Sequence, residues 1–279
     1  MAPLRSVPVL LLAATACPTR AARNAAWDAG DLAQEASGSA APKEVQTEVE
    51  GEEGTTSFRR YFIDEAGKRI SPWHDLPLEA GSMGEYWMVT EIPAVTKPKM
   101  EISTAEPNNP IAQDIKKGKL REYGGPIFWN YGYLPQTWED PNVEHLGAFG
   151  DNDPVDVVEI GARKHGQGEV TRVKVLGALA MIDSGELDWK MIVIDVDDPR
   201  AADLKDVADL EVKMPGYVSG IREWFRWYKV SEGKPLNAFG LGEKAVDHEA
   251  AIEIIKETHG HWQRLRNGEV ESKLWAGTA

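Results

Sequence analysis

Two long β-favouring runs separated by an acidic turn constrain the fold more than any other feature of this sequence. Val170–Ile182 and Trp189–Val196 are rich in apolar and β-branched residues, which is typical of buried strands. Between them the chain reads DSGELD, a glycine-containing turn with acidic side chains. The pattern predicts two long strands whose connection places several carboxylates at one end of a β-structure.

The other expected elements change from strands to helices along the chain. Shorter β-favouring segments come first, at Arg59–Ile63, Glu85–Ile92, Lys99–Ser103 and Val155–Ile160. Helical candidates follow the long strands, at Ala201–Leu210, Val218–Tyr228 and His248–Leu265. Many strands followed by helices favour a mainly β barrel or sandwich with outer helices, an α+β protein, over alternating βαβ units.

The first 57 residues differ in composition from the rest. Met1–Ala26 contains arginines but no acidic residue, and its apolar run Val7–Ala16 is too short to span a bilayer. Gly30–Ser57 is rich in Ala, Gly, Ser, Thr and Glu and lacks apolar periodicity. We therefore expect residues 1–57 to be a targeting presequence and disordered linker, and residues 58–279 to form one catalytic domain. The alternative is an N-terminal arm packed on that domain.

Charge and cysteine content exclude several classes of function. A net charge of -14 argues against a general nucleic-acid binder, which needs a basic face. The one cysteine, Cys17, lies in the expected presequence, so a disulfide scaffold, a cysteine zinc site and a thiol nucleophile are excluded from the mature body. An acidic protein can still act on an anion if clustered carboxylates collect the cations that hold it.

The segment most indicative of chemistry is Gly150–Gly161, GDNDPVDVVEIG. It sets Asp151, Asp153 and Asp156 within six residues, and Pro154 stiffens the turn. Carboxylates this close repel one another unless cations lie between them, and hard oxygen ligands suit magnesium or manganese. A solvated acidic turn is the alternative, but the apolar strand that follows attaches the turn to a rigid element, which favours a metal site.

A second acidic group lies in the turn between the long strands. It offers Asp183, Glu186 and Asp188, with Lys190 just beyond. A plain hairpin turn is the alternative interpretation. If both acidic turns face the same end of a barrel, their carboxylates converge with a lysine. Donors to phosphate oxygens can come from basic and aromatic residues elsewhere, namely Lys99, Arg121, Tyr228 and Lys229.

The segment DNDPVD at Asp151–Asp156 resembles the signature of the soluble family I inorganic pyrophosphatases. The resemblance extends from about Phe58 to Leu265 in family order, through MVTEIPAVTKPKMEIS, QDIKKGKLR, NYGYLPQTWEDP, GELDWK, EWFRWYKVSEGKP and IIKETH. SPWHDLPL and FGLGEK are similar to the plastid branch of the longer, eukaryotic form. The resemblance implies a closed, OB-like, five-stranded β-barrel with helices outside and the active site at the barrel mouth.

The resemblance also implies a role for each matching residue. Asp151, Asp156 and Asp188 resemble the main magnesium ligands, and Asp153 resembles the residue that activates the attacking water. Further metal or water ligands are Glu91, Glu101 and Asp183. The phosphate-binding set comprises Lys99, Arg121, Tyr131, Lys190, Tyr228 and Lys229.

The implied reaction is metal-dependent hydrolysis of inorganic pyrophosphate to two orthophosphates by direct attack of metal-activated water. The implied cofactor is Mg²⁺, with several ions per site and Mn²⁺ as a possible substitute. Pyrophosphate is the expected partner, and neither nucleic acid nor a membrane is expected. The similarity to plastid forms favours a plastid after removal of the presequence, with the mitochondrion as the alternative.

Two departures from the family pattern concern assembly. Fungal and animal relatives carry an Arg-Trp pair that contributes to their dimer contact, whereas this chain has Ala94 and Val95. The stretch between Arg121 and Asn130 is also different and shorter. We therefore expect either a monomer or a homodimer.

Two other functions are alternatives to pyrophosphate hydrolysis. Asp151–Val155 also fits DxDx[TV], the nucleophile motif of haloacid-dehalogenase-type phosphatases, although those enzymes place it directly after an apolar strand, usually near the start of the domain. A non-catalytic OB-like binding module is the other alternative, and it would need basic and aromatic residues rather than carboxylate clusters on its surface.

Overall fold

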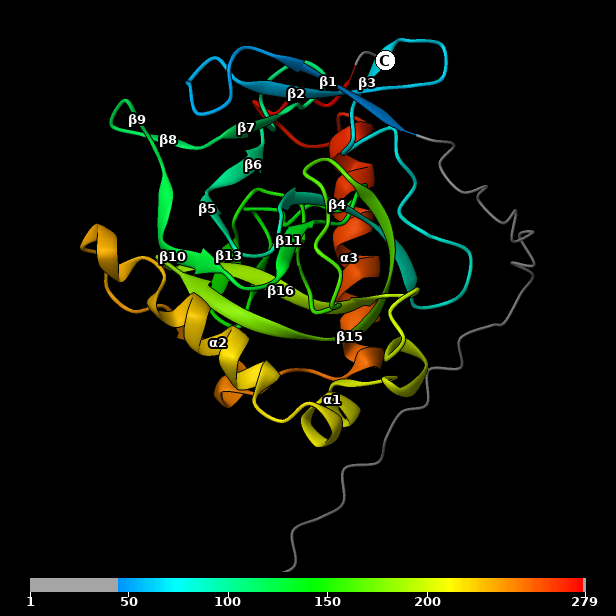
Figure 1. Cartoon of the computed structure of the whole chain (residues 1–279), viewed down its shortest axis with the longest axis vertical. Helices are drawn as coiled ribbons and strands as arrows, with labels where there is room; N and C mark the ends of the chain where they lie inside the picture. Colours follow the sequence, from blue (N-terminus) through cyan, green and yellow to red (C-terminus); the bar gives the residue numbers. More distant parts are fainter. Residues whose placement is uncertain (1–44, 278–279) are drawn as a thin grey trace, which may run out of the picture. The chain divides into compact units, whose positions relative to one another are not determined.

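The computed structural model describes residues 45–277, so most of the expected presequence lies outside the described residues. Five strands form a ring of pairings at the centre of this body (Figure 1). Each pairs with the next, and the last pairs with the first. In ring order they are β4 (Glu85–Ile92), β11 (Asn130–Tyr133), β14 (Asp156–Glu159), β16 (Glu186–Asp195) and β15 (Val170–Asp183).

The long hairpin β15/β16 forms because both strands can bury apolar side chains on both faces. Every residue of β16 after Glu186 is buried, and β15 is buried from Val175 to Met181. Interior β-branched and aliphatic residues fit such strands well. Side chains on the two faces join two separate hydrophobic clusters, which include Ile192 and Val193 respectively. The predicted long strands are therefore confirmed, with small changes at their ends.

Three α-helices cover the outside of the ring. They are α1 (Val207–Lys213), α2 (Tyr217–Trp227) and α3 (His248–Arg266). Figure 1 shows α3 running beside the strands, while α1 and α2 lie beside β15. Asp206 and Asp247 cap α1 and α3 by accepting hydrogen bonds from backbone N–H groups of the first turn. The expected helix at Ala201–Leu210 is instead a 3₁₀ turn, η1 (Ala201–Asp203), followed by a separate α1.

A second sheet lies beside the ring (Figure 1). Its strand order is β1 (Gln46–Glu50), β2 (Arg59–Ile63), β7 (Ile111–Gln113) and β6 (Met100–Ile102), and β3 (Arg69–Ile70) also pairs with β2. The strand β1 corrects our expectation of a linker up to residue 57, because Gln46–Glu50 pairs in register with Arg59–Ile63. Backbone hydrogen bonds can hold such a segment in place without an apolar pattern.

Short elements complete the described body. The pair β5 (Thr96–Pro98) and β10 (Glu122–Ile127) and the pair β8 (Ile115–Lys116) and β9 (Lys119–Leu120) form two small two-stranded sheets. Strands β12 (Glu144–His145), β13 (Ala148–Gly150) and β17 (Ala238–Phe239) extend the central sheet. The remaining 3₁₀ turns are η2 (Val230–Glu232) and η3 (Leu241–Glu243).

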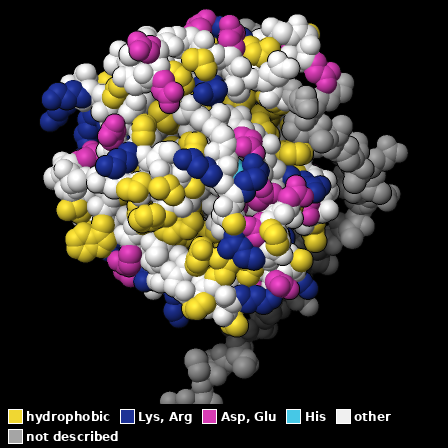
Figure 2. All heavy atoms as spheres, in the orientation of Figure 1, with side chains coloured by type: hydrophobic (Ala, Val, Ile, Leu, Met, Phe, Trp, Pro, Cys, Tyr) yellow, Lys and Arg dark blue, Asp and Glu magenta, His cyan; other side chains and the backbone are white. Residues whose placement is uncertain are grey.

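Charges of both signs are interspersed on the surface shown in Figure 2, where Lys and Arg side chains lie among Asp and Glu side chains. That face offers no continuous basic area of the kind that nucleic acids require. Among residues 45–277, no helix is long and apolar enough to cross a membrane.

Candidate active site

A cavity of about 560 Å³ lies where strands of the ring begin and end. Glu91 at the end of β4, Asp156 at the start of β14 and Asp183 at the end of β15 all line it. The second sheet and α2 supply further walls, through residues such as Glu101 and Phe225. The cavity therefore draws on segments that are distant in sequence.

The first acidic turn is held in shape by its own hydrogen bonds. Asp151 Oδ1 accepts from the backbone N–H of Asp153 at 3.0 Å, and Asn152 has a φ of 75°, which Asn tolerates better than most residues. Gly150 is required just before the turn, because a Cβ there would lie 2.5 Å from the Glu139 carbonyl. Strand β13 pairs in parallel with β16, so that Gly150 lies opposite Leu187. This register brings the acidic turn after Gly150 close to Asp188, which follows Leu187 in the sequence.

The second acidic turn is a tight hairpin. Ser184 and Gly185 both have positive φ, which matches the two-residue turn that suits the twist of paired strands. The register pairs Asp183 with Glu186. Asp188 and Lys190 are two residues apart on β16, so both side chains point to the same side of the strand and into the cavity. The sequence left open whether the two acidic turns face the same place, and the lining of the cavity shows that both contribute to it.

Lys190 lies at the centre of the charged groups. Its ammonium is buried and donates to Asp188 Oδ1 at 2.5 Å, to Tyr131 Oη at 3.0 Å and to Asp156 Oδ2. Burial by itself lowers the pKa of Lys190, but the two carboxylates raise it well above its usual value. Lys190 is therefore a fixed positive charge among acids.

The other two lysines of the predicted set are also paired with carboxylates. Lys229 and Tyr228 both donate to Asp183 Oδ2, the tyrosine at 2.8 Å. Burial raises the pKa of Asp183, yet Lys229 outweighs it and holds the pKa below its usual value. Lys99 forms an ion pair with Glu101. Each of the three lysines thus neutralises part of the acidic charge around the cavity.

Three carboxylates, of Glu139, Asp151 and Asp188, lie close together. One oxygen each from Glu139, Asp151 and Asp188 lies within 4.8 Å of the others. Burial raises the pKa of all three groups, that of Asp188 to about 7, and mutual repulsion adds to the effect for Glu139 and Asp151. These oxygens are hard donors that crowd one another, so the donor set fits a hard divalent cation.

Asp153 differs from its neighbours in its exposure. Its side chain reaches the solvent in the cavity, yet desolvation by the surrounding walls, followed by the charge of Asp156, raises the pKa to about 6. A carboxylate with this pKa is mostly ionised at neutral pH and can still accept a proton.

Comparison with known proteins identifies this geometry. A family model described as inorganic pyrophosphatase matches residues 88–263. The chain belongs to the inorganic pyrophosphatase family. It is 50% identical over 232 residues to a soluble inorganic pyrophosphatase of Arabidopsis thaliana named as chloroplastic, covering 82% of this chain and 77% of the relative. It is 51% identical over 223 residues to a chloroplastic relative from Chlamydomonas reinhardtii, covering 79% of each.

A solved inorganic pyrophosphatase structure shows the same fold. The N-terminally truncated vacuolar soluble pyrophosphatase of Trypanosoma cruzi, described in complex with PPi, superposes with a TM-score of 0.77 at 44% identity. The match covers 80% of this chain and 92% of that structure. The mainly β fold with outer helices is therefore shared within the inorganic pyrophosphatases.

Nearly all residues predicted from the pyrophosphatase resemblance come together in the cavity. Those that line it are Asp151, Asp153, Asp156, Asp183, Asp188, Glu91, Glu101, Lys99, Lys190, Lys229, Tyr131 and Tyr228. Arg121 does not line the cavity. Its guanidinium donates to Asp114 Oδ2 at 2.5 Å and to Glu232 Oε1 at 2.7 Å, just behind the wall that Asp114 forms.

Sequence reasoning missed several acidic residues in or behind the walls of the cavity. Asp114 and Glu232 hold Arg121, and Lys116 also pairs with Glu232 at 2.5 Å. Glu139 joins Asp151 and Asp188. Only tertiary structure brings these groups to the site, although the Glu139-Asp140 pair in an otherwise apolar and aromatic stretch is a signal that sequence reasoning can use.

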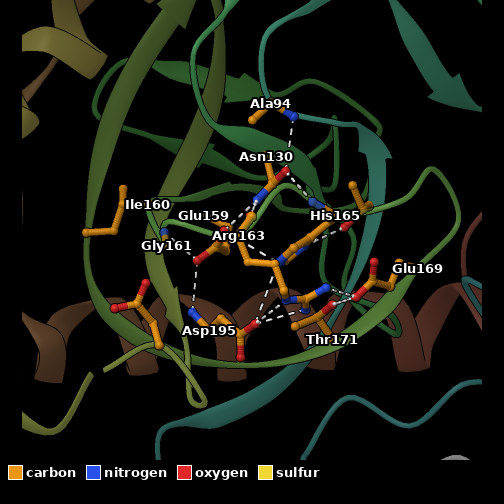
Figure 3. Close-up of polar contacts among 12 residues, drawn as sticks. Ala94, Asn130, Glu159, Ile160, Gly161, Arg163, His165, Glu169, Thr171 and Asp195 are labelled. Carbon is orange, nitrogen blue, oxygen red and sulfur yellow. Dashed lines mark hydrogen bonds and ion pairs between the residues drawn. The ribbon is translucent and has the colours of Figure 1, made fainter. Parts of the chain in front are cut away.

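A buried polar network supports the first residue of β11, next to the cavity residue Tyr131 (Figure 3). Asn130 Oδ1 accepts from the N–H groups of Ala94 and His165, both at 3.0 Å, while its Nδ2 donates to Glu159 at 2.7 Å. These bonds join the segment after β4 and the loop before β15 to β11 and β14. They fix the strand from which Tyr131 reaches the cavity of this pyrophosphatase.

Proposed function

We propose that this chain hydrolyses inorganic pyrophosphate to two orthophosphates by direct attack of water, with the help of divalent cations. Hydrolysis of pyrophosphate is the reaction that defines the family. The observation that carries the proposal is the gathering of many acids and three lysines around one cavity, with Lys190 buried between Asp156 and Asp188. A site for a polyanion alone would not need so many carboxylates.

The carboxylates divide into main and further metal ligands in this proposal. Asp151, Asp156 and Asp188 would hold the main cations, and Glu91, Glu101 and Asp183 would hold others directly or through water. When bound, Mg²⁺ makes water more acidic and neutralises charge on the phosphoryl oxygens. Oxygen-only donors support Mg²⁺, with Mn²⁺ as a substitute.

Asp153 would act as the general base. It is the most exposed acid of the turn and lines the cavity, so it can contact an attacking water molecule. Its carboxylate would orient this water, accept its proton and release that proton to solvent. The oxygen of water then forms the new bond to phosphorus while the bridging P–O bond breaks.

The cationic and phenolic side chains would bind the two phosphate groups. Lys99, Lys190 and Lys229 each form an ion pair with a carboxylate in the cavity. When metal and substrate bind, each lysine would exchange its carboxylate for a phosphate oxygen, and each carboxylate would exchange its lysine for a metal cation. Tyr131 and Tyr228 can donate from their hydroxyls. Arg121 would reach a phosphate from behind Asp114 by a small movement of its long side chain.

A phosphate-release assay tests the proposed function. Purified residues 45–277 are incubated with pyrophosphate or with ATP, each with and without Mg²⁺. We expect release from pyrophosphate only with the metal, and little release from ATP. Release that is independent of metal, or a clear preference for ATP, would count against the proposal.

We also propose that the ring of five strands is the closed OB-like barrel implied by the resemblance. The pairing of β15 with both β4 and β16 supports this. It joins the last strand of the series to the first, so that each of the five strands has a partner on both sides.

We further propose that the chain works in a plastid after removal of a presequence, with the mitochondrion as the alternative. Similar relatives from a plant and an alga are named chloroplastic, which supports the plastid. A fluorescent fusion of residues 1–57 tests it, and fluorescence in mitochondria or outside the cell would contradict it. Whether the chain is a monomer or a homodimer stays a prediction that sedimentation can decide.

A further inference from the structure

Glu139 carries an unpaired carboxylate oxygen and lies next to Asp151 and Asp188, two acids that line the cavity. The residue lies in the loop between β11 and β12, with an exposed fraction of 3%. Its Oε1 accepts from the backbone N–H of Trp189 at 2.9 Å. Its Oε2 is buried and has no hydrogen-bond partner among residues 45–277. Because buried carboxylate oxygens are costly without a partner, this one calls for an explanation.

The unpaired group belongs to the acidic triad of Glu139, Asp151 and Asp188, whose contributing oxygens lie within 4.8 Å of one another. Backbone bonds prevent Glu139 from moving away. Its N–H donates to the Asp153 carbonyl at 2.9 Å, and its carbonyl accepts from Asn152 at 2.9 Å. The loop of Glu139, the acidic turn and β16 are thus fastened together around the triad.

Within residues 45–277, Glu139 lacks the cationic partner that several acids of the cavity have. Asp188 and Asp156 share Lys190, and Asp183 is paired with Lys229. In the described part of the chain, no lysine, arginine or histidine forms an ion pair with Glu139. Among the described residues, Lys190 pairs with Asp188 but with neither Glu139 nor Asp151, and a divalent cation would stabilise these converging carboxylates.

We propose that Glu139 is a direct ligand of the divalent cation held by Asp151 and Asp188. This inference rests on the proposed function, which places a cation between those two aspartates, and adds a third carboxylate to it. Glu139 also links the cation to the start of β16 through Trp189, so the ligand that binds the metal also fixes the strand that carries Asp188.

Metal binding without substrate tests the inference. In Glu139→Gln the amide oxygen can still accept from Trp189, while the charge that faces Asp151 and Asp188 is lost. Titration calorimetry with Mg²⁺ and Mn²⁺ should show at least ~10-fold weaker binding at the tightest site, the scale seen when groups around a metal are altered. Without metal, the variant should melt at the same temperature as the parent or higher, because one of three like charges is gone.

Asp140→Asn is the matched control. Asp140 is also buried, but its Oδ2 accepts from Arg264 at 2.9 Å, and its Oδ1 accepts from the backbone N–H of Asn142. This variant should bind metal like the parent. Parent-like affinity in Glu139→Gln would show that Glu139 only tethers Trp189 and would overturn the inference.

A second measurement does not depend on a folded variant. A crystal structure of the parent with Mn²⁺ should place an anomalous peak in direct contact with Glu139 Oε2, and a peak separated from it by water would refute direct ligation. The two proposals also fail separately. A parent that binds Mn²⁺ but does not hydrolyse pyrophosphate refutes the proposed function, whereas an active parent with unaltered metal affinity in Glu139→Gln refutes only the role of Glu139.

Discussion

The ring nitrogen Nδ1 of His74 accepts a 2.8 Å hydrogen bond from Nε1 of Trp262. Because an indole N–H can only donate, Nδ1 must be unprotonated. The proton therefore lies on Nε2, which donates to the carbonyl oxygen of Trp275 at 2.9 Å. Neutral His74 thus joins three separate parts of the chain, namely the loop after β3, helix α3 and the C-terminal segment.

Stability should fall when His74 is protonated. Burial lowers its pKa from 6.5 to about 4, so the unfolded chain binds this proton more readily than the folded chain does. The free energy of unfolding that neutral His74 contributes is fully present well above pH 6.5 and is lost as the pH falls toward 4. Between pH 6.5 and 5 the loss should be about 2 kcal/mol of unfolding free energy, measured by urea denaturation. His74→Gln, which is already destabilised, should lack this part of the slope, and an unchanged slope in that variant would contradict the assignment.

Arg121→Lys should weaken substrate or transition-state binding by about 1–3 kcal/mol, the range for a charge-assisted hydrogen bond. The planar guanidinium is held by Asp114 on one nitrogen and Glu232 on another, and an ammonium cannot keep this fork while also meeting a phosphate. Steady-state kinetics with pyrophosphate measure the effect. Arg163→Lys, outside the cavity, is the control, and parent-like kinetics for Arg121→Lys would make Arg121 a structural residue.

Asp153→Asn should fold and still bind magnesium but lose at least ~100-fold in rate, the scale of a general base. The residue is exposed to the cavity, and its backbone N–H bond to Asp151 does not depend on its own carboxylate, so the turn should keep its shape. Calorimetry checks metal binding and phosphate release checks the rate. Near-normal turnover would remove Asp153 from the proposed role.

Acid quenching during turnover of radiolabelled pyrophosphate should leave no label on the protein. Asp151 belongs to the triad with Glu139 and Asp188, a position suited to binding metal rather than to attacking phosphorus. The haloacid-dehalogenase alternative requires Asp151 to become an aspartyl phosphate. Stoichiometric, hydroxylamine-sensitive label on Asp151 would establish that alternative instead of direct attack by water.

Deletion of residues 1–44 should leave activity and melting temperature unchanged, whereas deletion of residues 1–57 should destabilise the protein by about 1 kcal/mol, a typical cost for losing a few partly exposed contacts. The longer deletion removes β1 and the partly buried Val45, which packs against the core. Thermal denaturation of both proteins measures the difference. Equal stability would mean that β1 contributes nothing to the body.

The sequence predicts those parts of the fold that have a repeating apolar pattern. The strand predicted at Glu85–Ile92 has the same bounds in the structure, and the helix predicted at His248–Leu265 ends one residue later, at Arg266. Both have a regular apolar pattern because one face of each element is buried. The strand β1 was not expected, because QTEVE is mostly exposed and is held by backbone pairing that leaves no apolar pattern.

The sequence predicts the site residues that belong to recognisable motifs. It does not predict the residues that only tertiary contacts bring to the site. The resemblance identified all three lysines and all but one of the aspartates that line the cavity, the exception being Asp114. It did not identify Glu139, whose nearness to Asp188 depends on the loop after β11 packing against β16. It also did not reveal that Asp114 and Glu232 hold Arg121 behind the cavity wall.

The edge position of β1 bears on self-association. In its sheet β1 pairs only with β2, and it presents the exposed acids Glu48 and Glu50, which also pair with Arg69. Charged side chains on an outer strand discourage other chains from adding to the sheet. A protein cleaved just after Glu50 would instead offer the free edge of β2, with Tyr61 and Phe62, as a template for another copy. Proteolytic trimming that removes β1 should therefore convert well-behaved preparations into ones that aggregate through strand pairing, whereas trimming that stops before residue 45 should not.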